Sequence, residues 1–137
     1  MCFLSFNKSA LVIFGVFYSI DALPTLYLHR QYLRANKHKS YEILYDRLLE
    51  FNQGKRTEYL VSDMKQITVY LCPNLYKGSN FHFFGIESYY YARVELRNGE
   101  HFFLTCLLHP KLDKKLKKLQ GIIIERKKSF FPSLKSK

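Results

Sequence analysis

Residues Ser9–Leu28 read SALVIFGVFYSIDALPTLYL, and the chain turns basic directly after them. A helix of about 20 mostly apolar residues can cross the ~30 Å hydrocarbon core of a bilayer. The basic flank includes Arg30 and Arg34, and an excess of Lys and Arg beside a span holds that side in the cytoplasm. The sequence therefore predicts an anchor in the cell membrane, with the remaining residues on the cytoplasmic face.

Asp21 and Pro24 leave other interpretations of this segment open. An acidic residue near the centre of a span costs about 2.5–3.5 kcal/mol, and proline kinks a helix. The segment could break here into a first membrane segment over residues 1–20 and an interfacial helix over residues 23–33. It could also be a signal peptide, although only Lys8 precedes the apolar core and no clear cleavage site follows it. A third alternative is the buried core helix of a soluble protein.

Length and composition indicate one small domain after this segment. The chain has 137 residues and a formal net charge of +11, and its eleven Tyr and twelve Phe favour strands. Cys2, Cys72 and Cys106 form no Cys-x-x-Cys pair, which argues against a zinc or thioredoxin-type site. Free thiols are typical of a reducing compartment, in agreement with a cytoplasmic domain.

Several short runs after Lys39 favour strands. Gly54 follows the second run in a stretch typical of a hairpin turn, because glycine readily adopts positive φ. Phe81, Phe83 and Phe84 lie in a loop or irregular strand over residues 75–87, and we expect them to pack onto the domain, with a place at an interface as the alternative. The predicted strands are residues 41–45, 48–51, 57–61 and 67–71.

Asn98-Gly99 joins two further strand-like runs, residues 89–97 and 100–108. This dipeptide is the strongest short signal for a two-residue type I′ turn. In that register Val94 pairs with Phe103, and both face the core. Leu104 then lies on the opposite face, whose distal half is apolar, and we expect the basic C-terminal segment to cover it.

Residues 111–119 read KLDKKLKKL, which places Leu112, Leu116 and Leu119 at helical spacing. Gly121 is a plausible end for this helix, and residues 122–124 form a short β-type run. The pattern predicts a short C-terminal helix with a leucine stripe on one side and lysines on the rest.

The order of these pieces resembles the bacterial PH-like domains found on small membrane proteins. The stretches that carry the resemblance are DALPTLYLHRQYL, NQGKR, SDMKQI, YYYARVELRNGEHFFLTCLL and the basic helix after them. The resemblance implies a mainly β (α+β) fold: an N-terminal membrane helix, then a PH-like antiparallel β-sandwich or barrel with a short C-terminal helix. We expect a transmembrane or interfacial segment over residues 1–33 and a PH-like β domain over residues 39–134.

Chemistry-bearing motifs are absent from the sequence. It contains no metal-binding box, no glycine-rich phosphate loop and no nucleophile elbow. We therefore expect a protein that is not an enzyme and needs no catalytic residue, metal or cofactor. Nucleic-acid binding is disfavoured, because no recognition motif accompanies the basic charge.

Basic residues are the candidate contacts with a partner. The attraction of anionic headgroups is worth ~1 kcal/mol per basic residue near a membrane surface. The first hypothesis is a membrane-tethered binding module that contacts anionic phospholipid or a membrane protein. The alternative is a structural or accessory subunit that packs against a larger membrane complex. The candidate contact residues are Arg30, Arg34, Lys114, Lys115, Lys117, Lys118, Arg126, Lys127 and Lys128.

Overall fold

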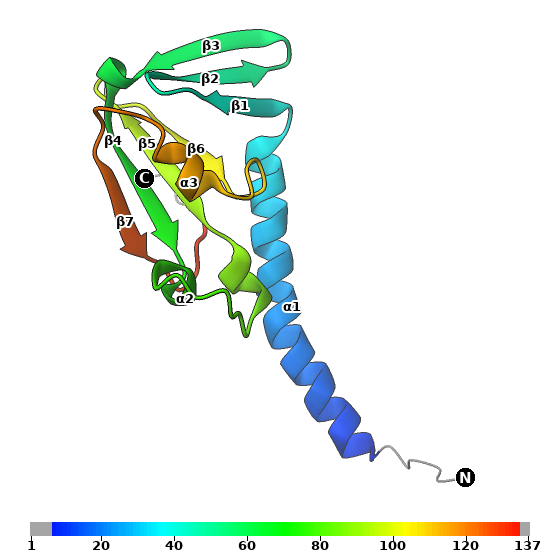
Figure 1. The fold of residues 1–137 in the computed structure, drawn as a ribbon. Coiled ribbons are helices and arrows are strands. Elements are labelled where there is room, and N and C mark those ends of the chain that lie inside the picture. Colours follow the sequence, from blue (N-terminus) through cyan, green and yellow to red (C-terminus); the bar gives the residue numbers. More distant parts are fainter. Residues whose placement is uncertain (1–6, 135–137) are drawn as a thin grey trace.

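The computed structural model describes residues 7–134, a long helix followed by two sheets (Figure 1). Cys2 lies outside the described residues. The elements are α1 (Lys8–Asn36), β1 (Lys39–Ile43), β2 (Arg47–Asn52), β3 (Lys55–Leu60), η1 (Val61–Asp63), β4 (Met64–Leu71), α2 (Pro73–Tyr76), η2 (Gly85–Ser88), β5 (Tyr91–Leu96), β6 (His101–Thr105), α3 (Leu112–Leu116) and β7 (Ile124–Lys128).

Helix α1 is continuous from Lys8 to Asn36, with Pro24 inside it. Asn7 begins the helix by accepting the backbone N–H of Ser9 at 3.3 Å. The segment is therefore one helix and not the two pieces that a break after residue 20 would give. Within residues 7–134 it is the one helix long and apolar enough to cross a membrane, and only 6% of its apolar window is buried.

The two halves of α1 have different surroundings. The first half projects beyond the sheets (Figure 1) and exposes large apolar side chains all around its axis, for example Phe14 at 69% and Tyr18 at 77%. The second half lies against the domain, where Leu28 and Tyr32 are completely buried. The first half of the helix is thus an exposed apolar segment, and the second half is part of the packed domain.

The strands form two sheets and no closed barrel, so the architecture is the sandwich of the two expected alternatives. One sheet has the order β1-β2-β3 and the other β6-β5-β4-β7. All strand pairs are antiparallel except β4 with β7, which is parallel. The β2–β3 turn has positive φ at both Gln53 (49°) and Gly54 (81°), as a type I′ turn requires, which confirms the predicted hairpin.

The register predicted for the second hairpin is wrong by one residue. Val94 pairs with Phe102, and Arg93 with Phe103. Only Gly99 of the dipeptide has positive φ (90°), so the loop has three residues and closes through the Leu96 N–H to the Glu100 carbonyl at 2.8 Å. A one-residue slip exchanges the two faces of a strand.

This shift in register decides which side chains of β6 pack on each face of the four-stranded sheet, where two separate apolar clusters lie. Leu104 joins the cluster of Ala92 and Val94, whereas Phe103 lies on the other face with Tyr91. The predicted core positions of Phe103 and Leu104 are therefore exchanged.

Each face of the four-stranded sheet has its own cover. Leu112, Leu116 and Leu119 of the α3 region pack onto the face that also contacts the three-stranded sheet, which confirms the leucine stripe. The opposite face is covered by Leu28 and Tyr32 of α1, with help from Leu134. The expectation that the basic C-terminal segment covers this face is therefore wrong, except for Leu134 itself.

The chain continues after α3 into an edge strand. Gly121 adopts φ 82° after the helix, and β7 begins at Ile124, so the strand starts where the predicted run ends. Its exposed basic residues follow Ile124, and charged side chains discourage pairing of an open edge with other chains.

Candidate functional site

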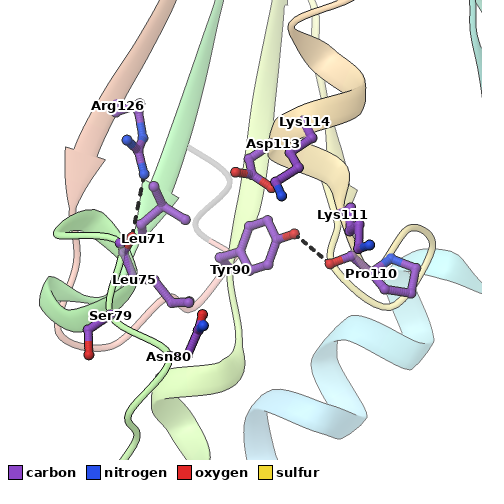
Figure 2. Close-up of a pocket in the computed structure, with 11 residues that line it drawn as sticks. Leu71, Leu75, Ser79, Asn80, Tyr90, Pro110, Lys111, Asp113, Lys114 and Arg126 are labelled. Carbon is purple, nitrogen blue, oxygen red and sulfur yellow. Dashed lines mark hydrogen bonds between the residues drawn. The ribbon is translucent and has the colours of Figure 1, made fainter.

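An open cavity of about 460 Å³ lies between α2 and the region around α3 (Figure 2). Tyr90 lies at its centre, between the two walls. The remaining walls come from β4, the loop after α2, the turn before α3 and β7. The lining residues are Leu71, Leu75, Gly78, Ser79, Asn80, Tyr90, Pro110, Lys111, Asp113, Lys114 and Arg126.

The hydroxyl of Tyr90 holds one wall in place. It donates to the Pro110 carbonyl and accepts the backbone N–H of Leu112, both at 3.1 Å. Burial, assisted by the nearby Asp113 carboxylate, raises the pKa of Tyr90 to about 12. The hydroxyl is therefore neutral at physiological pH and keeps both hydrogen bonds.

The charge of the cavity is positive. Lys111, Lys114 and Arg126 line it against the single carboxylate of Asp113. Among the described residues, neither lysine takes part in an ion pair. The two ammonium groups are exposed and thus available to an anion from solution.

The opposite wall is built around Arg126 and Tyr76. The Arg126 guanidinium lies 5.3 Å from the centre of the Tyr76 ring, and Nζ of Lys128 lies 5.0 Å from it. Arg126 Nη2 also donates to the Leu75 carbonyl at 3.5 Å. These contacts hold β7 and α2 together and leave Arg126 at the rim of the cavity.

The structure brings together only some of the basic residues that the sequence singled out. Lys114 and Arg126 share the cavity. Lys127 is paired with Glu125 at 3.4 Å. Lys117 and Lys118 are exposed beyond the cavity, at the end of α3.

Lys115 is engaged with His109 and does not face the cavity. His109 Nε2 lies 2.8 Å from the Tyr41 carbonyl, which can only accept, so this nitrogen carries the proton. Nδ1 is then free to accept from Lys115 Nζ at 3.0 Å. This lysine connects α3 to β1 through the histidine.

Arg30 and Arg34 lie on α1 beside a separate, smaller groove of about 170 Å³, together with Tyr27 and Gln31. Gln31 binds the C-terminal segment, since its Oε1 accepts the Leu134 N–H at 2.9 Å and its Nε2 donates to the Leu134 carbonyl at 3.2 Å. The two arginines therefore belong to the α1 surface and not to the cavity.

Lys111, Tyr90 and Asn80 are cavity residues that sequence reasoning missed. Lys111 precedes the predicted helix in a run where every lysine looks equivalent. Its position in the cavity depends on the turn that Tyr90 holds. No local pattern links Asn80 to α3, because the two are brought together only by the fold.

Nucleophilic chemistry is disfavoured by the surroundings of Cys72 and Cys106, the two cysteines among the described residues. Burial, and secondarily Glu87, raises the pKa of the Cys72 thiol to about 11, and burial also raises that of Cys106. Residues 7–134 contain no group of three His, Cys, Asp or Glu side chains placed to hold a metal ion. What the cavity offers is cations and polar donors.

A family model described as a PH domain matches residues 1–117, which includes α1 and ends before β7. Neither a curated protein nor a solved structure matches the chain.

Proposed function

The chain belongs to the PH domain family, and from this premise we propose that it is a membrane-tethered PH-like binding module that lies on the cytoplasmic face of the cell membrane. Modules of this family commonly bind lipids or proteins. The observation that carries the tether is the first half of α1, whose large apolar side chains are exposed on every side of the helix. Water does not favour such a surface, whereas the hydrocarbon of a bilayer does.

The orientation follows from the charges beyond the apolar segment. Arg30, Arg34, Lys37 and Lys39 come directly after it, whereas Lys8 alone precedes it among the described residues. Lys and Arg near the end of a span remain on the cytoplasmic side. The domain, which follows these residues, is therefore proposed to face the cytoplasm.

Carbonate extraction of membranes from cells that express the full chain tests the tether. We expect the protein to stay in the pellet. The matched variant F14D/F17D should move to the supernatant, because each buried charge costs about 2.5–3.5 kcal/mol of insertion. Release of the unaltered chain into the supernatant would overturn the tether, and the exposed apolar surface of α1 would then be assigned to a contact with another protein.

The proposed ligand of the cavity is the headgroup of an anionic phospholipid. Lys111, Lys114 and Arg126 supply positive charge, and Ser79 and Asn80 supply polar groups at the same opening. The tether would keep this opening within reach of a membrane surface, whose anionic lipids add ~1 kcal/mol per basic residue. Arg30, Arg34, Lys127 and Lys128 would contribute to the attraction without lining the cavity.

Thermal unfolding of the full chain in neutral detergent, with and without short-chain phosphatidylglycerol, tests the ligand. A ligand that binds only the folded state raises the unfolding temperature. We expect this rise for the unaltered chain at low salt and its loss in K111E/K114E. The control K117E/K118E makes the same charge change outside the cavity and should keep the rise.

Two results would contradict this assignment. Equal loss in both double variants would mean that the charge of the whole molecule, and not the cavity, attracts the lipid. If the unfolding temperature of the unaltered chain is no higher with short-chain phosphatidylglycerol than with short-chain phosphatidylcholine, the anionic headgroup is not the ligand, since electrostatic attraction is greatest at low salt. The remaining candidate would then be the accessory subunit, for which a membrane protein should copurify with the full chain in fixed stoichiometry.

A further inference from the structure

The apolar segment of α1 overlaps the domain along the helix axis. Residues 8–20 project from the domain, which at 1.5 Å per residue is about 20 Å of helix. The hydrocarbon core of a bilayer is ~30 Å thick. From Asp21 onward the helix is already in contact with the domain, through Gly85 at the start of η2, directly after the loop that leads into it (Figure 1). A placement that buries the apolar segment therefore brings this loop to the membrane.

The loop in question, which we call the phenylalanine loop (residues 79–84), exposes aromatic side chains. Phe81, Phe83 and Phe84 are 63%, 75% and 49% exposed, so they do not pack onto the domain as the sequence suggested. The rings of Phe81 and Phe83 meet edge to face with centres 4.7 Å apart. Between Lys77 and Glu87 the loop region contains no Asp, Glu, Lys or Arg, and His82 is its one titratable side chain.

The loop is held in shape by one carboxylate. Oε2 of Glu87 accepts the backbone N–H groups of Phe83 at 2.7 Å and Phe84 at 3.4 Å, and its Oε1 accepts from Asn74 at 3.1 Å. A single side chain thus satisfies two backbone donors at the tip. The exposure of the phenylalanines is a property of an ordered turn.

The loop is also fixed to α1 through Gly85, which follows it directly as the first residue of η2. Oδ1 of Asp21 accepts the N–H of Gly85 at 2.9 Å. A Cβ at Gly85 would lie 2.8 Å from Oγ1 of Thr25, one turn further along the helix, so the backbone approaches α1 as closely as glycine allows. Asp21, the one acidic residue of the apolar segment, therefore has a partner where the helix meets the domain.

We infer that the phenylalanine loop inserts into the interfacial zone of the bilayer beside α1, as a second membrane contact that sets the depth and tilt of the domain. This inference rests on the proposed tether. The bilayer is the occupant that fits, because the exposed rings belong to a loop whose next residue, Gly85, is bound to Asp21 within the apolar segment of α1. Apolar side chains such as Phe bury at the boundary between the headgroups and the acyl chains, and a second contact restricts rotation of the domain about the helix.

Tryptophan fluorescence tests the insertion, because the chain contains no Trp. The full chain is reconstituted in phosphatidylcholine vesicles whose acyl chains carry bromine, which quenches indole on contact. Three single-Trp variants are compared: F14W on the projecting part of α1, F83W in the phenylalanine loop, and Y45W between β1 and β2. Tyr45 is 66% exposed and lies in the turn between β1 and β2, two strands of the sheet at the C-terminal end of α1 (Figure 1).

We expect F14W to be blue-shifted and strongly quenched, and Y45W to be unaffected. F83W should be quenched more by bromine near the headgroup than by bromine near the chain ends. If F83W behaves as Y45W does while F14W is quenched, the inserted loop is wrong and the tether stands. If F14W is not quenched, the tether itself fails, and the inserted loop fails with it. Unchanged circular dichroism of the three variants shows that each has kept its fold.

Discussion

At the scale of single residues, Tyr90 connects β5 to the start of α3 through one hydroxyl group. That hydroxyl donates to the Pro110 carbonyl and accepts the buried N–H of Leu112. The position of Lys111, and with it the charge of the cavity, depends on this turn. The side chain of Tyr90 is thus both the floor of the candidate site and the support of one wall.

Tyr90→Phe should destabilise the domain by about 0.5–1.5 kcal/mol for each hydrogen bond lost. The Pro110 carbonyl loses this donor, while the Leu112 N–H keeps the His109 carbonyl as its other acceptor. Urea unfolding of the full chain in neutral detergent measures the change. Tyr45→Phe is the matched control and should have no measurable effect, because that ring is exposed. Equal stability of the two variants would contradict the supporting role of the Tyr90 hydroxyl.

Buried tyrosines also predict alkaline unfolding. Burial raises the pKa of Tyr90 and Tyr91 to about 12, whereas the unfolded chain titrates near the usual 10. Between these values the unfolded state has released protons that the folded state retains, so the free energy of unfolding falls with rising pH. We expect the contribution of the tyrosines to be complete below pH 10 and to be lost progressively from 10 to 12, after an earlier loss from about pH 9 as Cys72 titrates in the unfolded chain, measured as a falling urea midpoint. Tyr90→Phe should reduce this loss, and a flat profile in the unaltered chain would contradict it.

At the scale of elements, α1 combines two environments in one helix. Leu26 is 63% exposed, whereas Leu28, two residues further, is completely buried beside Tyr32 and Tyr91. The Tyr32 hydroxyl donates to the Pro132 carbonyl at 2.7 Å, so the helix also binds the C-terminal segment. The anchor and the domain core are therefore one continuous element.

Leu28→Ala should destabilise the domain by about 2–5 kcal/mol, because it leaves a cavity against the sheet. Leu26→Ala removes the same atoms from an exposed position and should cost little. Chemical unfolding of the full chain in detergent, followed by circular dichroism, compares the two. A similar cost for both leucines would mean that α1 does not pack on the sheet.

Contact between α1 and the phenylalanine loop can be tested by a double-mutant cycle. Gly85→Ala places a Cβ against Oγ1 and Cγ2 of Thr25, which should cost about 1–3 kcal/mol. Thr25→Ala removes both atoms, so the double variant should recover most of that loss. Thermal unfolding of the four proteins gives the coupling energy. Additive costs would show that the two residues do not touch.

At the scale of the whole molecule, the domain depends on residues that the sequence assigns to the anchor. Two fragments test this dependence: residues 22–137 retain the packed half of α1, and residues 39–137 remove it. We expect the longer fragment to unfold cooperatively and the shorter one to be less stable and to bind hydrophobic dyes, because Tyr91 and Phe103 lose their cover. Equal stability of the two would place the start of the domain at residue 39, as the sequence alone suggested.

Local chemistry was sufficient to predict much of this protein. The apolar segment, the turn at Gly54 and the leucine stripe of α3 depend on residues close together in the sequence, and the structure contains each of them. The order of elements was also enough for the PH-like resemblance, which the family match supports. These features follow from hydrophobic periodicity and backbone freedom, which act within a few residues.

The rest was decided by tertiary structure. The three-residue loop with positive φ at Gly99 set the register of β6 and exchanged the places of Phe103 and Leu104, which no count of alternating residues reveals. Packing on the sheet made half of α1 a part of the core. The cavity gathers Asn80, Lys111 and Arg126 from segments that are distant in the chain. A sequence shows which side chains are apolar and which are charged. Which of them come into contact depends on how distant segments of the chain pack together.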